Sequence, residues 1–224
     1  MAGAGAGILE FLGLQKEERS FMGIKAVIFD LGGVIVRTEN PEPRRKLAAE
    51  LGITSQALSQ LVFSSETAVL ATLGRLTTQE HWEAVRGALN LEEDKLRRVP
   101  IEFWGGDSVD MHLVDYLRSL RPRYKTGLLS NAWDDLRQVI IRDWKISDAF
   151  DEMIISAEVG LAKPDARIYL LAAEKLDVSP DEAVFVDDFD ENIHGALQVG
   201  MQAIHFRDPH QALSELAMIL DQRA

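Results

Sequence analysis

The sequence predicts an α/β fold, a doubly wound parallel sheet into which an all-helical cap is inserted. Two observations predict it. From Ile24 onward, short apolar runs rich in β-branched residues alternate with segments of helical periodicity, which is the pattern of a parallel sheet flanked by helices. Between 39 and 108 this alternation stops, and helical periodicity continues without a convincing strand. A chain of 224 residues is long enough for one such domain with an insertion.

The predicted strands are short and almost continuously apolar, so we expect the sheet to be buried on both faces. Helical stripes lie between them and predict the helices that cover the sheet. In chain order, the predicted strands are 24–29, 125–130, 153–156, 183–187 and 202–206.

The predicted insertion carries several helix signals. Pro41 opens it, and Thr77 with Glu80 forms a capping box before the apolar stripe that begins at Trp82. We therefore expect a core made of 23–38 and 109–224, with a helical cap at 39–108 that covers an active site. Residues 1–22 combine a small-residue repeat with a short apolar patch, which predicts a flexible leader rather than a secretory signal.

Composition excludes several classes of function. The chain has 36 Asp and Glu against 24 Lys and Arg, a formal net charge of −12, so we expect no nucleic-acid partner. No apolar run approaches the roughly 18 residues that span a bilayer, so we expect no membrane partner and a cytoplasmic location. The absence of Cys excludes disulfides, thiolate metal sites and a cysteine nucleophile. Nothing in the sequence indicates an oligomeric state.

Polar residues follow the predicted strands, at the point where each strand ends. In open α/β sheets, the ligand crevice lies beyond the carboxyl ends of the strands, so these residues are expected to meet there. They are Asp30 and Gly32 after the first strand, Ser130 and Asn131 at the end of the second, Lys163 in the loop after the third, and Asp187 and Asp188 at the end of the fourth.

The residue types at this edge indicate one class of chemistry. Asp30, Asp187 and Asp188 would repel one another if they converge, so they require a cation. Carboxylate oxygens without His or Cys favour Mg²⁺ over Zn²⁺. Lys163 would neutralise a carboxylate or a bound anion, and Ser130 could donate to a phosphoryl oxygen. Together these groups predict phosphoryl transfer through an aspartyl intermediate.

Four motifs in order across most of 24–206 resemble those of the haloacid dehalogenase-like hydrolases. They are FDLGG at 29–33, LLSN at 128–131, Lys163 within AKPDARIY, and FVDDFDEN at 185–192. The closest resemblance is to the bacterial glucose-1-phosphate phosphatases of that superfamily. This resemblance implies a Rossmannoid core with a helical cap, and a small phosphorylated metabolite as the substrate.

The resemblance also implies roles for the residues that match these motifs. Asp30 would attack phosphorus and become the phosphoaspartate. Ser130 and Lys163 would act in catalysis by holding the transferring phosphoryl group, and Asn131 would steady the loop or the substrate.

A Mg²⁺ site is implied at the same place. Asp188 aligns with a direct ligand of the ion and Asp187 with an acid that holds a metal-bound water. Asp30 and the carbonyl of Gly32 would complete the protein ligands, while Asn192 stands where other members carry a further acid. The main departure is Gly32 itself, because most phosphatases of the family have an Asp there that transfers a proton.

Three hypotheses for function therefore stay open at this stage. The first is a Mg²⁺-dependent phosphatase that hydrolyses a small phosphate monoester, such as a sugar phosphate, through an aspartyl-phosphate intermediate. The second is a metal-free dehalogenase, against which the paired acids Asp187 and Asp188 argue. The third is a catalytically weak binding protein that has kept the fold, and Gly32 is its best support.

A few other residues invite functional hypotheses of their own. His81 is expected to be a surface imidazole. The tryptophans at 104, 133 and 144 are expected to be packing residues. Three arginines of the predicted cap are candidates for binding a second anionic group: Arg44, Arg45 and Arg75.

Overall fold

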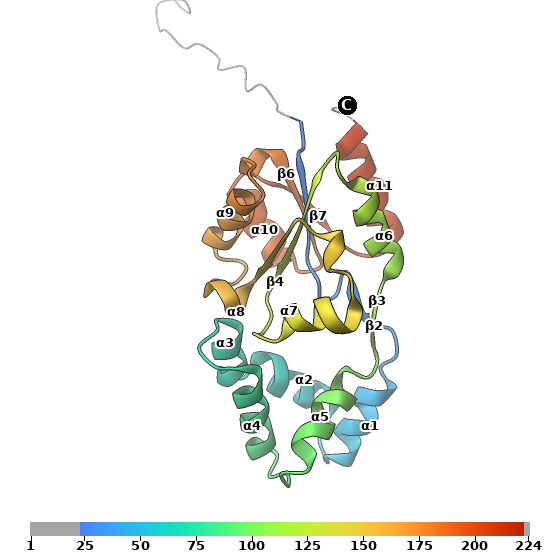
Figure 1. Cartoon of the computed structure of the whole chain (residues 1–224). Coiled ribbons are helices and arrows are strands. Elements are labelled where there is room, and N and C mark those ends of the chain that lie inside the picture. The colour runs from blue at the N-terminus through green and yellow to red at the C-terminus, as the bar shows by residue number, and fades with distance from the viewer. Residues whose placement is uncertain (1–22, 222–224) are drawn as a thin grey trace, which may run out of the picture.

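The computed structural model describes residues 23–221, and the predicted leader at 1–22 lies outside them. A parallel sheet of five strands forms the centre, in the order β5-β4-β1-β6-β7, as Figure 1 shows. Within 23–221, no helix has the length and apolar character needed to cross a bilayer. The strands are β1 (Ala26–Phe29), β4 (Lys125–Ser130), β5 (Glu152–Ile155), β6 (Ala183–Asp187) and β7 (Gln202–His205).

Helices cover both faces of this sheet because successive side chains of each buried strand point to opposite faces. From β1, Val27 and Phe29 enter a cluster with α6 (Met111–Leu120) and α11 (Pro209–Asp221). Ile28 enters the cluster on the other face, with α9 (Ala166–Lys175) and α10 (Asp190–Gln198). The predicted doubly wound parallel sheet is therefore confirmed, and all five predicted strands form within two residues of their predicted bounds.

Five helices lie between β1 and the rest of the core in the sequence, and in Figure 1 they lie across the end of the sheet where the strands finish. They have an apolar cluster of their own, which includes Leu58, Trp82 and Phe103. We refer to these helices as the cap. The exact division of the chain into core and cap stays a prediction. The cap helices are α1 (Glu42–Glu50), α2 (Ser55–Ser64), α3 (Glu66–Thr72), α4 (Thr78–Ala88) and α5 (Lys95–Trp104).

A short antiparallel ribbon joins the cap to the core, and sequence analysis did not predict it. Its strands are β2 (Val36–Thr38) and β3 (Asp107–Val109). Side chains support the pairing, since Arg37 forms an ion pair with Asp110 at 2.7 Å and Thr38 Oγ1 donates to Asp107 at 2.6 Å. Strands of three residues are too short to show a period in the sequence, which is why the ribbon was missed.

The remaining elements are brief and lie in the loops of the core. A π-helical turn continues α7 directly and was also not predicted. The elements are α7 (Leu136–Gln138) with its π-helical turn (Val139–Trp144), α8 (Ser156–Val159), and two 3₁₀ turns at Ser147–Ala149 and Pro180–Glu182.

Candidate active site

The register of the sheet brings polar side chains together at the carboxyl ends of β1, β4 and β6. Phe29 lies opposite Val186, so the next residues, Asp30 and Asp187, are neighbours across two strands. The main-chain N–H of Asp30 donates to Val186 O at 2.8 Å. Ser130 ends β4, the strand on the other side of β1. Asp30, Ser130 and Asp187 are all buried.

Lys163 is the cation of this cluster. Its Nζ lies 2.7 Å from Asp30 Oδ1 and 2.6 Å from Asp187 Oδ2, and its side chain is 1% exposed. The main chain at Lys163 is held by Asn131, whose Oδ1 accepts from Lys163 N at 2.8 Å and whose Nδ2 donates to Lys163 O at 2.9 Å. Asn131 thus fixes the loop from which the ammonium group reaches the two carboxylates.

Asp187 has its oxygens fully engaged. Besides Lys163, it accepts from the main-chain N–H of Phe189 at 2.8 Å and from Asn192 Nδ2 at 3.0 and 3.1 Å. Asn192 is itself held by Tyr169, whose hydroxyl donates to Asn192 O at 2.9 Å. Donors from Lys163, Phe189 and Asn192 therefore fix the orientation of the Asp187 carboxylate, which in turn holds the Lys163 ammonium group in place.

Asp188 differs from its neighbour in having a free oxygen. Its Oδ1 is buried and has no hydrogen-bond partner among the described residues. The other side of the carboxyl group faces Gly33, where a Cβ atom would lie 2.2 Å from Asp188 Oδ2. Gly33 also has a φ of +82°, a backbone conformation that favours glycine. The turn after β1 therefore admits the Asp188 carboxyl group only because residue 33 has no side chain.

One oxygen each from Asp30, Asp187 and Asp188 lies within 4.8 Å of the others. Burial raises the pKa of Asp30 to about 7, while Lys163 lowers it and Asp187 raises it further. Burial, with the charge of Asp187, also raises the pKa of Asp188. Three carboxylates with a single ammonium group leave excess negative charge, and the unpartnered Asp188 Oδ1 offers a ligand atom. This all-oxygen donor set fits a hard divalent cation such as Mg²⁺.

The other two predicted site residues lie at the same edge. Ser130 is 3% exposed, and its hydroxyl makes no hydrogen bond to another described residue, so it remains free to donate to a ligand. Gly32 is exposed in the turn after Asp30, and no atom lies within 4 Å of where its Cβ would be. The structure therefore brings every sequence-predicted site residue to one edge of the sheet, and the chemical role of each stays a prediction.

His81, expected at the surface, is instead fully buried in the cap. Its Nε2 donates to Val62 O at 3.0 Å, which leaves Nδ1 to accept from the Thr67 hydroxyl at 2.9 Å. Burial lowers the pKa of the imidazole. His81 and Val85 are four residues apart on one helix, so they lie on the same face, and Val85 is buried. This spacing was the signal in the sequence that places His81 on the buried face of the helix. We call the cluster of Asp30, Asp187 and Asp188 at the end of the strands the carboxylate edge. With both ring nitrogens engaged inside the cap, His81 is not a proton donor for it.

Sequence analysis also missed the contact between cap and core. The loop after Asn131 carries Asp134, whose Oδ1 accepts from the N–H of Thr78 at 2.8 Å and from its hydroxyl at 2.7 Å, at the start of α4. Nearby, a Cβ at Gly74 would lie 2.0 Å from the carbonyl oxygen of Ala157 in α8. The loop that follows Ser130 and Asn131 therefore also holds the cap.

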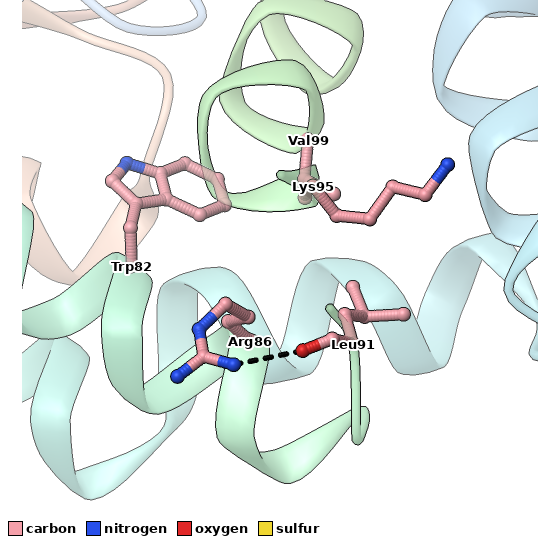
Figure 2. Close-up of a pocket in the computed structure, with 5 residues that line it drawn as sticks. All are labelled: Trp82, Arg86, Leu91, Lys95 and Val99. Carbon is pink, nitrogen blue, oxygen red and sulfur yellow. Dashed lines mark hydrogen bonds between the residues drawn. The ribbon is translucent and has the colours of Figure 1, made fainter. Parts of the chain in front are cut away.

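The cavity in Figure 2 lies inside the cap rather than at the carboxylate edge. It is formed between α4 and α5, where Arg86 donates to Leu91 O at 2.8 Å. None of the clustered acids contributes to it. Its lining residues are Trp82, Arg86, Leu91, Lys95 and Val99.

Comparison with known proteins places this site in a family. The model of the haloacid dehalogenase-like hydrolases matches residues 24–200, which span all four motifs and the cap. The chain belongs to the haloacid dehalogenase-like hydrolases. The resemblance predicted from the motifs is confirmed at this level, and the closeness to glucose-1-phosphate phosphatases stays a prediction.

Two curated proteins align along most of the chain. Bifunctional epoxide hydrolase 2 of Sus scrofa is 29% identical over 88% of this chain, but the chain spans only 39% of that protein. D-ribitol-5-phosphate phosphatase of Bacteroides thetaiotaomicron is 27% identical over 88% of this chain and 99% of its own length.

A solved structure confirms the fold of this hydrolase. It is a HAD family enzyme from Bacteroides thetaiotaomicron in complex with magnesium and inorganic phosphate, with a TM-score of 0.69. The match covers 84% of this chain and 96% of that one at 23% identity, so the likeness is one of fold.

Proposed function

We propose that this hydrolase is a Mg²⁺-dependent phosphatase that hydrolyses a small phosphate monoester through an aspartyl-phosphate intermediate. One observation carries the proposal. The Asp30 carboxylate lies at the end of the central strand with Lys163 at 2.7 Å and two further carboxylates within 4.8 Å. A relative named as a sugar-alcohol phosphate phosphatase, matched over nearly its whole length, supports the same reaction class.

The ion pair indicates which oxygen of Asp30 reacts. Lys163 binds Oδ1, which leaves Oδ2 outside that contact and available to attack phosphorus. In the first step, a bond forms between this oxygen and phosphorus as the bond from phosphorus to the leaving oxygen breaks. The departing oxygen takes a proton from solvent. Water then attacks phosphorus and loses a proton to solvent as the bond to Asp30 breaks, which releases inorganic phosphate and restores the carboxylate. Lys163 and Ser130 would bind the oxygens of the transferring group in both steps.

Binding of Mg²⁺ would use Asp30, Asp188 and the carbonyl of Gly32, with Asp187 supporting them. When bound, the ion would supply positive charge that offsets the repulsion between an anionic nucleophile and an anionic phosphate. The donors that fix the Asp187 carboxylate and the unpartnered Oδ1 of Asp188 support this assignment.

The substrate class follows from Gly32. Glycine cannot donate a proton to the departing oxygen, and His81 does not take that place because both of its ring nitrogens are engaged inside the cap. The reaction then favours leaving groups that carry negative charge well. Anomeric sugar phosphates release a comparatively acidic alcohol, so we infer that a sugar phosphate of this kind suits the site better than a primary alkyl phosphate.

Neither alternative accounts for the carboxylate edge as well. A dehalogenase in which Asp30 attacks carbon needs no metal and no second and third acid beside the nucleophile. A binding protein has no need to bury mutually repelling carboxylates, which destabilise the folded state unless a cation offsets them.

A panel of small phosphate monoesters, assayed with Mg²⁺ and with chelator, tests the proposal. We expect turnover that requires Mg²⁺ and is absent in Asp30→Asn. A matched control is Asp165→Asn, which removes the charge of a half-buried acid that caps α9 and pairs with Arg167, while asparagine can still cap the helix. Halide release from 2-chloropropionate that is insensitive to chelator would overturn the proposal in favour of a dehalogenase. Mg²⁺ binding without turnover of any phosphate ester would favour the binding protein.

A further inference from the structure

Two large aromatic side chains are exposed where α2 and α5 end. Phe63 is 47% exposed and Trp104 is 38% exposed. Their ring centroids lie 5.5 Å apart at an interplanar angle of 65°. Trp133, from the loop of the core, is half-buried against the apolar cluster of the cap, with its ring 6.2 Å from that of Trp104. We call these three side chains the aromatic wall.

Both ends of the aromatic wall are tied to the carboxylate edge by short stretches of chain. Trp133 follows Ser130 by three residues, which places their Cα atoms at most about 11 Å apart. On the cap side, Trp104 is followed by two glycines and then by β3, which pairs with β2. The turn after Asp30 leads directly into β2, and Gly33 N donates to Val36 O at 2.8 Å. Trp133 therefore lies close to Ser130, and Trp104, whose ring is 6.2 Å from that of Trp133, lies on the side of the cap that meets this loop of the core.

The arginines nearest the wall are already neutralised. The Arg44 guanidinium lies over the ring of Phe103, 4.1 Å from its centroid, and pairs with Asp107 at 3.3 Å. Arg45 pairs with Glu42 on its own helix. The third sequence candidate, Arg75, lies in the turn before α4, on the side of the cap that contacts α8. The Arg44 guanidinium also lies 5.9 Å from the ring centroids of both Phe63 and Trp104, so its ion pair with Asp107 leaves the wall with aromatic rings and a neutralised cation rather than an unpaired one.

We propose that Phe63, Trp104 and Trp133 select the leaving group, and that the preferred substrate carries one phosphate on a neutral group with a carbon-rich face, such as a ring. The proposal rests on the proposed phosphatase function. Exposed aromatic rings gain free energy when a ring or the C–H face of a sugar covers them. A second phosphate or carboxylate would meet no unpaired arginine at the wall.

Binding of non-hydrolysable phosphonates separates this inference from the reaction itself. Dissociation constants for benzylphosphonate and ethylphosphonate are measured by calorimetry in the presence of Mg²⁺, on the wild type and three variants. We expect the wild type to bind benzylphosphonate roughly five- to tenfold more tightly. Trp104→Ala and Phe63→Ala should each reduce this preference to about twofold or less, and Trp104→Phe should keep most of it.

Ile101→Ala is the matched control, because Ile101 lies on the same helix α5 and is 72% exposed but belongs to no aromatic pair. It should leave both constants unchanged. Three results would overturn the inference: no preference in the wild type, an equal loss for both phosphonates in the wall variants, or tighter binding of 2-carboxyethylphosphonate than of benzylphosphonate. A protein that binds neither phosphonate overturns it as well.

The phosphatase proposal fails by a different result, because it depends on turnover of phosphate esters and on Asp30. A preference for benzylphosphonate in a protein that hydrolyses no ester would support the aromatic wall while removing the reaction. Turnover that is lost in Asp30→Asn, together with equal binding of the two phosphonates, would support the phosphatase reaction and remove the role of the aromatic wall.

Discussion

The carboxylate edge and the contact between cap and core hold their side chains in different ways. At the edge, strand register places Asp30 beside Asp187, and both carboxylates pair with Lys163. At the cap contact, Thr78 meets Asp134 across 56 residues of sequence through exposed hydrogen bonds. The first arrangement follows from the sheet itself, whereas the second depends on how a separate helical layer packs. We therefore expect changes at the edge to act on chemistry, and changes at the cap contact to act on stability and closure.

The largest effect is expected from Asp30→Asn. The amide has the same shape as the carboxyl group but cannot attack phosphorus, so turnover should fall by at least about 10³-fold. The folded state should persist, because the substitution removes one of three clustered acids and Lys163 keeps Asp187 as a partner. Turnover and circular dichroism are measured on both proteins. Turnover within tenfold of the wild type would exclude Asp30 as the nucleophile.

The second prediction adds at Gly32 the acid that this chain lacks. No atom lies within 4 Å of the Cβ position, so Gly32→Asp has room for a carboxyl group. Rates on primary alkyl phosphates should rise by about 10²-fold relative to those on aryl phosphates, because a proton now reaches the poor leaving group. A graded series of aryl and alkyl phosphates is assayed on both proteins, with Gly32→Asn as the control. An unchanged, shallow dependence on leaving-group pKa would mean that another residue already supplies the proton.

The third prediction concerns the ion. Mg²⁺ should stabilise the folded protein, by about 2.7 kcal/mol at a concentration one hundred times its dissociation constant. Asp188→Asn should weaken Mg²⁺ affinity because, of the three clustered acids, Asp188 is the one with a buried oxygen that has no hydrogen-bond partner. Thermal unfolding with and without Mg²⁺ measures both. The control is Asp190→Asn, an exposed acid two residues away. Equal Mg²⁺ affinity in Asp188→Asn and the wild type would contradict the ligand assignment.

A pair of glycines tests how tightly the edge is packed. Gly33→Ala would place a Cβ 2.2 Å from Asp188 Oδ2 at a φ of +82°, so the free energy of unfolding should fall by about 1–3 kcal/mol. Gly32→Ala should change it by less than about 0.5 kcal/mol, since its Cβ meets no atom within 4 Å. Denaturant unfolding measures both. Equal losses for the two variants would mean that the turn tolerates Asp188 in another position.

The same contrast explains what the sequence predicted and what it did not. Asp30, Ser130 and Asp187 were predicted together because each ends a strand, and parallel strands end at one edge. That argument needs only local patterns. The expectation that Asn131 would steady the loop or the substrate came from the family resemblance, and the local pattern did not show that the loop in question is that of Lys163, 32 residues away.

The features that sequence analysis did not predict depend on tertiary packing. His81 was expected at the surface as a polar residue, yet two hydrogen bonds inside the cap offset its burial. Trp133 was expected to be a packing residue, and its ring does pack against that of His81, at 4.6 Å. What the sequence could not show is that it packs on a helix from another layer of the fold. No local pattern encodes a contact of this kind.

The smallest effect is expected at the cap contact, from Thr78→Val. Valine keeps the branched shape and the main-chain N–H but loses the hydroxyl that donates to Asp134 at 2.7 Å and Asp135 at 2.9 Å. The free energy of unfolding should fall by about 0.5–1.5 kcal/mol, as for one typical hydrogen bond, because solvent exposure weakens this bond to a charged group. Asp134→Ala should cost about the same or slightly more, since it also removes the acceptor for the N–H of Thr78 at the start of α4.

Coupling between the two residues distinguishes a true contact from two separate effects. In a double-mutant cycle, Thr78→Val and Asp134→Ala together should cost less than the sum of the single losses, by roughly 0.5–1 kcal/mol. Gln79→Ala, at the next exposed position of α4, should show no coupling to Asp134→Ala. If the contact holds the cap over the site, both single variants should raise KM for a small phosphate ester more than they lower kcat, whereas Asp30→Asn acts on kcat. Strict additivity in the cycle would mean that the hydrogen bonds of Thr78 do not hold the cap and that its apolar contacts alone do so. The contact that closes the cap on the core would then be that of Trp133 rather than that of Thr78.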